Sequence, residues 1–152
     1  MAKVGVGDLA PDFTLQDQHG RPVTLSSLRG DKLVVLFFYP KDETRVCTAE
    51  ACSFRDSFQV FQDAGAVVIG VSPDSTESHA GFAANHRLPF TLLADVGGRV
   101  AKSYGARLLG LLTSRVTFVI DRQGVIRHRF TAQMVAREHV DEALRVVRSI
   151  RR

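Results

Sequence analysis

Residues 32–56 have the sequence KLVVLFFYPKDETRVCTAEACSFRD, which predicts a buried strand followed by a long helix. The segment Lys32–Tyr39 is a nearly continuous apolar run, which is typical of a strand buried on both faces. Pro40 ends the strand, because proline cannot donate to a sheet ladder. Helical spacing follows from about Thr44 to Ala64, where phenylalanines at intervals of four and three predict one apolar face: Phe54, Phe58 and Phe61.

The rest of the chain alternates between extended and helical patterns. We expect further strands at Asp12–Gln16, Val23–Leu25, Ala66–Val71, Pro89–Leu93, Arg115–Asp121 and Val125–Phe130. We expect a helical turn at Ser26–Gly30, a loop and helix at Pro73–Arg87, a short helix at Gly98–Tyr104 and a terminal helix at Arg137–Ile150. This order predicts an α/β fold in one domain over residues 1–152, with a central mixed β-sheet and helices on both faces. The closing hairpin and helix suit a thioredoxin-like sheet.

The net charge of +4 comes from charges that are scattered along 152 residues. The densest basic cluster lies near the C-terminus, and we interpret it as a solvated helix end: Arg145, Arg148, Arg151 and Arg152. A nucleic-acid-binding function is the alternative, but the aromatic residues expected of a single-strand binder are missing there. No stretch approaches the roughly 20 apolar residues of a membrane helix. The first residues do not resemble a signal peptide, so we expect a cytoplasmic location and no membrane partner.

Cys47 falls in the first turn of the predicted helix, where unpaired N–H groups and the helix dipole favour a thiolate. Thr44 lies three residues earlier, and its hydroxyl can cap the helix or hydrogen-bond to the thiolate. Pro40 can fix the loop and shield one side of the sulfur. A lone helical cysteine is usually a small buried hydrophobe, but Cys52 follows five residues later. A zinc site would need three or four ligands, and the histidines are dispersed.

The spacing of the two cysteines has a mechanical consequence. Residues five apart in a helix lie roughly 8–9 Å apart between Cα atoms and point about 140° away from each other. A disulfide generally needs Cα atoms within about 7 Å. Cys47 and Cys52 therefore cannot pair while both lie in an intact helix, so pairing would require at least the first turns to unwind.

The segment FFYPKDETRVCTAEACSFRD (residues 37–56) resembles the signature of the peroxiredoxins of the bacterioferritin comigratory protein, or PrxQ, subfamily. The likeness extends over nearly the whole chain, through residues 64–75, 78–95 and 115–124. The resemblance implies a thioredoxin-like (peroxiredoxin) fold and a thiol peroxidase that reduces hydrogen peroxide and organic hydroperoxides in antioxidant defence. It implies that the enzyme needs no metal or organic cofactor, that thioredoxin or a similar dithiol recycles it, and that it is a monomer. From the residues themselves we expect no nucleic-acid partner.

Residue by residue, Cys47 matches the peroxidatic cysteine and Cys52 the resolving cysteine of members that form an intramolecular disulfide. Thr44 and Pro40 match the loop residues before the peroxidatic cysteine, and Arg115 matches a distant arginine. Glu50 corresponds to a family glutamate that orients this arginine. The equal alternative is that Glu50 is a solvated carboxylate on the helix surface. A dithiol oxidoreductase or redox sensor is the competing function, although such proteins favour two cysteines separated by two residues.

One position departs from the family pattern. Many relatives have Pro-Gly where this chain has Arg45-Val46. Valine is stiffer than glycine at the backbone, and Arg45 adds a cation near the sulfur. We hypothesise that this pair favours the Cys47 thiolate and alters the unwinding of the helix.

Overall fold

The computed structural model describes residues 4–108, 112–131 and 136–150, and the strands and helices named below lie within these ranges. The strands are β1 Thr14–Asp17, β2 Pro22–Thr24, β3 Leu33–Phe38, β4 Ala66–Ser72, β5 Thr91–Ala94, β6 Arg107–Leu108, β7 Leu112–Thr113, β8 Val116–Ile120 and β9 Ile126–Thr131. The helices are α1 Arg45–Asp56, α2 Phe58–Asp63, α3 Thr76–His86, α4 Arg99–Ser103 and α5 Ala136–Ser149, with a 3-10 turn at Leu25–Leu28.

Seven strands form one mixed sheet in the order β2-β1-β5-β4-β3-β8-β9. The central strands β3, β4 and β5 are parallel, and β1 and β8 pair with them antiparallel. β3 is buried at every position, which explains its continuous apolar sequence. The parallel strands carry their C-terminal ends to one edge of the sheet, where function in such folds tends to lie.

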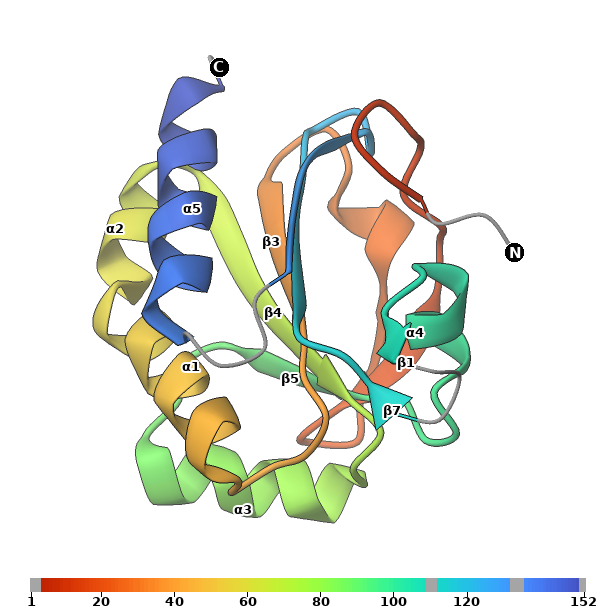
Figure 1. The fold of residues 1–152 in the computed structure, drawn as a ribbon, viewed down its shortest axis with the longest axis vertical. Helices are drawn as coiled ribbons and strands as arrows, with labels where there is room; N and C mark the ends of the chain where they lie inside the picture. Colours follow the sequence, from red (N-terminus) through yellow and green to blue (C-terminus); the bar gives the residue numbers. More distant parts are fainter. Residues whose placement is uncertain (1–3, 109–111, 132–135, 151–152) are drawn as a thin grey trace.

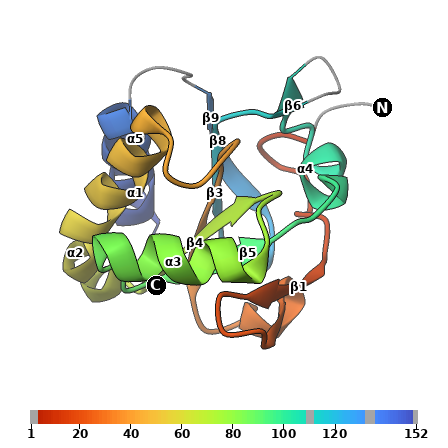
Figure 2. The same ribbon diagram turned by 90° about the horizontal axis from the view of Figure 1, so that it is seen from below.

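Helices cover both faces of the sheet, as predicted (Figures 1 and 2). The helices α1, α2 and α5 lie together on one face, and α4 lies on the other. The first face encloses a core that contains Phe37, Phe54 and Phe61, while the second encloses Phe38 and Phe118. Alternate residues of β3 thus enter opposite cores, as the two-residue period of a strand requires.

One local prediction was wrong, and one pair of strands was not predicted. The helix expected over Thr44–Ala64 is broken at Ser57, where ψ is 6° and the backbone N–H is shared between the Ser53 and Phe54 carbonyls. Serine competes with the helix backbone for hydrogen bonds, and this weakens a helix locally. Phe58 still packs against the core cluster that contains Phe54 and Phe61, so the predicted apolar face is confirmed. The small β6–β7 pair was not expected, since two-residue strands leave no periodic signal.

Within the described ranges, no helix combines the length and the apolar character needed to cross a membrane. Arg145 and Arg148 are exposed on α5, and Arg145 pairs with Glu142 at 2.8 Å. Arg151 and Arg152, the other members of the predicted basic cluster, lie outside the described residues.

Candidate active site

The register between β3 and β8 brings two distant parts of the chain to the same edge of the sheet. Phe38, the last residue of β3, pairs with Val116, the first residue of β8. The loop after β3 leads into α1 and Cys47, and Arg115 immediately precedes β8. The antiparallel pairing therefore places Arg115 beside the start of α1, although 68 positions separate it from Cys47.

The thiol of Cys47 lies in the first turn of α1 and is almost completely buried. A guanidinium nitrogen of Arg115, Nη1, donates a hydrogen bond to its Sγ atom at 2.6 Å. A cation in contact with a sulfur, together with the positive end of a helix, favours the thiolate, which is the nucleophilic form. The site therefore brings a buried thiol into contact with a guanidinium donor.

Thr44 is the N-cap residue of α1, but its side chain does not cap the helix. Its backbone carbonyl accepts the Thr48 N–H at 2.8 Å, and its hydroxyl donates to the Lys41 carbonyl at 2.9 Å. Of the two roles predicted for this hydroxyl, capping of the helix is therefore wrong, because the hydroxyl closes the turn before the helix; its hydrogen bond to the thiolate stays a prediction. Pro40 lies half-buried at the start of this loop, and its shielding role stays a prediction.

Both cysteines are free thiols within α1, and Cys52 is half-buried. This placement confirms that they share one intact helix, the condition under which five-residue spacing keeps them apart. Arg45, which departs from the family pattern, is exposed at the first position of α1.

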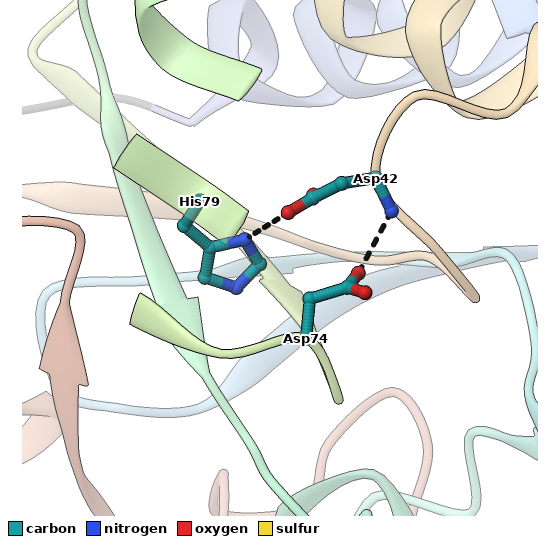
Figure 3. A group of neighbouring side chains, drawn as sticks. All are labelled: Asp42, Asp74 and His79. Atoms are coloured by element: carbon teal, nitrogen blue, oxygen red, sulfur yellow. Dashed lines mark hydrogen bonds and ion pairs between the residues drawn. The ribbon is translucent and has the colours of Figure 1, made fainter. Parts of the chain in front are cut away.

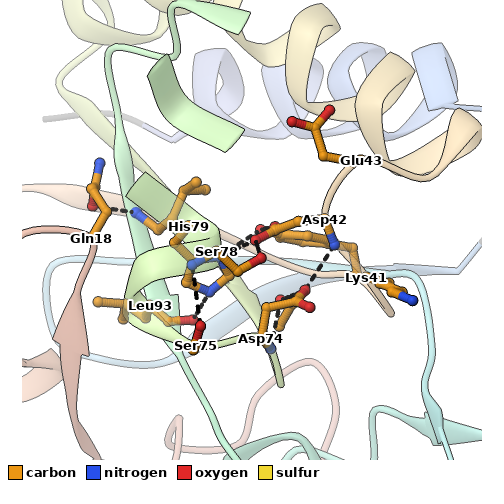
Figure 4. A network of polar contacts seen from close by, with 12 residues as sticks. Gln18, Lys41, Asp42, Glu43, Asp74, Ser75, Ser78, His79 and Leu93 are labelled. Carbon is orange, nitrogen blue, oxygen red and sulfur yellow. Dashed lines mark hydrogen bonds and ion pairs between the residues drawn. The ribbon is translucent and has the colours of Figure 1, made fainter. Parts of the chain in front are cut away.

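A buried polar network anchors the loop between β3 and α1 to helix α3 (Figure 4). The Asp42 carboxylate accepts from the Tyr39 hydroxyl at 2.6 Å and from the Ser78 hydroxyl at 2.8 Å. His79 Nδ1 lies 2.7 Å from the same carboxylate, and its Nε2 lies 2.9 Å from the Leu93 carbonyl. Because a carbonyl oxygen can only accept, Nε2 is the donor in its contact with Leu93. The ring thus ties the loop, α3 and β5 together.

A second contact fixes the next residue of the loop. Glu43 has a φ of 63°, which is unusual for a residue other than glycine. Its carboxylate accepts from Asn85 Nδ2 at 2.7 Å and pairs with His86 Nε2 at 2.7 Å. These hydrogen bonds hold the pKa of Glu43 below its usual value. The end of α3 therefore holds the backbone in this conformation just before Thr44.

Asp42, Asp74 and His79 have the donor atoms and spacing of a metal site (Figure 3). The same atoms, however, are already used in hydrogen bonds. Asp74 Oδ2 accepts from the Asp42 backbone N–H and from the Ser72 hydroxyl, each at 2.7 Å. The cluster is a hydrogen-bonded anchor of the loop, and its geometry requires no cation.

Glu50, one turn beyond Cys47, is fully buried. The alternative of a solvated helix carboxylate is therefore wrong. Burial raises the pKa of Glu50 to about 8, against the opposing effect of the Arg115 charge. His139 of α5 is also fully buried, with Nδ1 3.4 Å from Glu50 Oε2. The sequence pattern gave only a weak signal for His139, a histidine beside Val140 on the apolar face of the terminal helix, and no role was predicted for it.

A buried thiol at a helix start, in contact with a guanidinium on a thioredoxin-like sheet, defines a thiol peroxidase of the peroxiredoxin class. Comparison with known proteins agrees. The model of the AhpC/TSA family matches residues 6–129. Peroxiredoxin Q from the chloroplast of Sedum lineare is 49% identical over 152 residues, which cover 99% of this chain and 81% of that protein. The Arabidopsis thaliana chloroplast peroxiredoxin Q is 48% identical over 150 residues, 97% of this chain and 69% of that protein.

Solved structures show the same likeness. The crystal structure of peroxidoxin BcpB from Mycobacterium tuberculosis superposes with a TM-score of 0.90 at 41% identity, covering 97% of this chain and 99% of that one. Peroxiredoxin Q from Xanthomonas campestris gives 0.82 at 27% identity, covering 90% of each chain. The chain belongs to the AhpC/TSA family of peroxiredoxins, in its peroxiredoxin Q subfamily. It is a peroxidase that uses a peroxide substrate and a thiol reductant.

Proposed function

We propose that Cys47 is the peroxidatic residue and that Cys52 resolves its oxidised form, within a single domain that spans the chain. The Cys47 thiolate attacks the terminal oxygen of a hydroperoxide, so that an S–O bond forms and the O–O bond breaks. The leaving oxygen takes up a proton and departs as water or an alcohol. The observation that carries the proposal is the contact of 2.6 Å between Arg115 and the buried Cys47 sulfur.

Arg115 and the backbone N–H groups at the start of α1 hold the two peroxide oxygens in line in this scheme, while Thr44 and Pro40 shape the loop around them. Removal of a single such donor in other enzymes costs roughly 10²–10³ in rate. The buried anchor at Asp42 and the exposed one at Glu43 support this role, because they fix the loop before the reaction begins.

In the second step the thiol of Cys52 attacks the sulfenic acid of Cys47. An S–S bond forms, the S–O bond breaks, and the leaving hydroxide combines with the thiol proton as water. The shared helix must unwind for this step, since both residues lie in α1. A dithiol of the thioredoxin type then reduces the disulfide by thiol exchange. The monomeric state and the cytoplasmic location stay predictions.

Stopped-flow oxidation of wild type, Cys47→Ser and Cys52→Ser by hydrogen peroxide and an organic hydroperoxide tests both roles. We expect Cys47→Ser to lose the fast reaction, and Cys52→Ser to keep it but to stop cycling with thioredoxin. A fast reaction in Cys47→Ser would refute the peroxidatic role. Normal cycling of Cys52→Ser with thioredoxin would refute the resolving role, and peroxide inertness of the wild type would leave the dithiol oxidoreductase as the better description.

A further inference from the structure

The carboxyl group of Glu50 is buried without a hydrogen bond. Its side chain has no exposed surface, and neither Oε1 nor Oε2 has a hydrogen-bond partner within the described part of the chain. A buried carboxylate that lacks donors is strongly disfavoured, so such a group keeps its proton. The raised pKa of Glu50, about 8, agrees with this geometry and has burial as its main cause. In the folded helix Glu50 is therefore a neutral acid near pH 7.

The surroundings of Glu50 come from three elements. On its own helix, Cys47 lies one turn earlier. Arg115, which leads into β8, opposes the rise in the pKa of Glu50 through its charge. From α5, His139 places Nδ1 at 3.4 Å from Oε2, but the same nitrogen lies only 2.7 Å from the Thr117 hydroxyl on β8. The closer contact with Thr117 explains why the nearby imidazole does not supply a hydrogen bond to Glu50.

The neighbouring strand β9 adds one more titratable group on this side. His128 Nε2 lies 3.2 Å from Glu142 Oε2 of α5, so this histidine pairs with a carboxylate at the surface of that helix. Within the described residues, Glu50 therefore faces one cation, Arg115, and one buried imidazole, that of His139. Its proton is held by burial more than by any single partner.

Glu50 lies between the two cysteines in sequence, and this position links its proton to the unwinding of α1. Cys47 and Cys52 can meet only if the helical turns between them come apart. We expect that movement to carry Glu50 away from His139 of α5 and into water. An exposed glutamate has a pKa near 4.5, the value from which the pKa of Glu50 is raised by burial. Between pH 4.5 and about 8, the unwound segment thus binds one proton fewer than the helix.

We propose that Glu50 is a proton-coupled latch on the resolving step: the helix that holds Cys47 and Cys52 opens as Glu50 releases its proton. The inference rests on the proposed pairing of these cysteines. The covalent step is unchanged, with the S–O bond broken, the S–S bond formed and water released. The Glu50 proton passes separately to solvent and is regained when the disulfide is reduced. Glu50 acts through the helix, so it is a positioning residue.

The latch makes a quantitative prediction about the disulfide. Release of one extra proton makes disulfide formation up to tenfold more favourable for each pH unit between 4.5 and about 8. For a two-electron couple, a tenfold change equals about 30 mV. The midpoint potential of the Cys47–Cys52 couple should therefore fall about 30 mV per pH unit more steeply in the wild type than in Glu50→Gln, because glutamine keeps the shape but carries no dissociable proton.

Redox titration of the whole protein in dithiothreitol buffers across this pH window tests the latch. Glu77→Gln on α3 is the matched control, since it removes an exposed carboxylate from a different helix. We expect the control to follow the wild type and Glu50→Gln to show the shallower slope. Parallel slopes for wild type and Glu50→Gln would overturn the latch.

An infrared difference spectrum of the wild type keeps the inference testable if Glu50→Gln does not fold. A carboxylic-acid carbonyl band should be present in the reduced protein and absent after oxidation; no change in that band would overturn the latch. Mass spectrometry of the peroxide-treated wild type distinguishes failure of the resolving step from failure of the latch. Absence of a Cys47–Cys52 disulfide would refute the proposed resolving step and the latch with it. A disulfide with parallel slopes would refute the latch alone.

Discussion

At the scale of single residues, two arginines lie near the start of α1 but in different environments. Arg115 is half-buried and contacts the Cys47 sulfur at 2.6 Å, whereas Arg45 is exposed. Charges interact more strongly where water is excluded, so Arg115 should dominate the stabilisation of the thiolate. Arg45, which replaces the proline of many relatives, should then have only a minor electrostatic effect on the Cys47 thiolate.

We therefore expect Arg115→Met to slow the reaction with hydrogen peroxide about 10²-fold, in line with the loss of one preorganised donor. Stopped-flow rates and the ultraviolet absorbance of the thiolate measure the effect. Arg45→Met is the matched control, with the same side-chain change at the same end of the helix. Its effect should be small and should shrink further with added salt. Equal losses in both variants would show that general positive charge, and not the contact, activates Cys47.

At the scale of elements, the loop before α1 depends on α3 through the buried pair of Asp42 and His79. Removing His79 takes one hydrogen-bond partner from the buried Asp42 carboxylate, which keeps those from Tyr39 and Ser78. We expect His79→Asn to lower the free energy of unfolding by about 1–3 kcal/mol and to slow the peroxide reaction, because the loop loses part of its anchor. Urea unfolding measures the first effect. A variant with native stability and a native rate would contradict the anchoring role of this pair.

Gly70 of β4 lets the side chains of the neighbouring strands pack closely, because glycine has no Cβ atom. A Cβ atom added to Gly70 would lie 2.7 Å from Phe37 Cζ and 2.9 Å from Leu92 Cδ2. Phe37 in turn stacks on Phe54 of α1, with ring centroids 4.5 Å apart. We expect Gly70→Ala to destabilise the protein by about 1–3 kcal/mol through overpacking. Gly81→Ala is the control, because nothing lies within 4 Å of its added Cβ. A shift in thermal unfolding for Gly81→Ala as large as that for Gly70→Ala would rule out the steric explanation.

At the scale of the whole molecule, the sequence predicts what periodic patterns and local motifs encode. Apolar spacing along the chain predicts the buried strands, such as Lys32–Tyr39, and the terminal helix. It also predicts that both cysteines share one helix. The contact of Arg115 with Cys47 does not follow from local pattern, because it depends on the register of β3 and β8, and only the family resemblance indicated it. The burial of Glu50 likewise depends on how α5 packs against α1.

This packing gives the stability of the whole protein a distinct pH dependence. The pKa of Glu50 is raised from 4.5 to about 8 in the folded state, so the folded protein binds the extra proton between these values. The resulting stabilisation is fully present below pH 4.5 and is lost as the pH rises through about 8. Acidic groups whose pKa values are lowered in the folded state, such as Glu43 and Asp12, act in the opposite direction. A comparison of variants is therefore needed to isolate Glu50.

Glu50→Gln retains those other groups, so the difference in unfolding free energy between wild type and variant reports the Glu50 proton alone. We expect the wild type to lose up to about 1.4 kcal/mol relative to Glu50→Gln for each pH unit between 4.5 and about 8. Urea unfolding of both proteins in the reduced state, at several pH values in this window, measures the difference. Because both cysteines stay reduced, the measurement does not depend on the resolving step. A pH-independent difference would mean that Glu50 is already ionised in the fold, and that the contact of its Oε2 with His139 Nδ1 at 3.4 Å is then an ion pair.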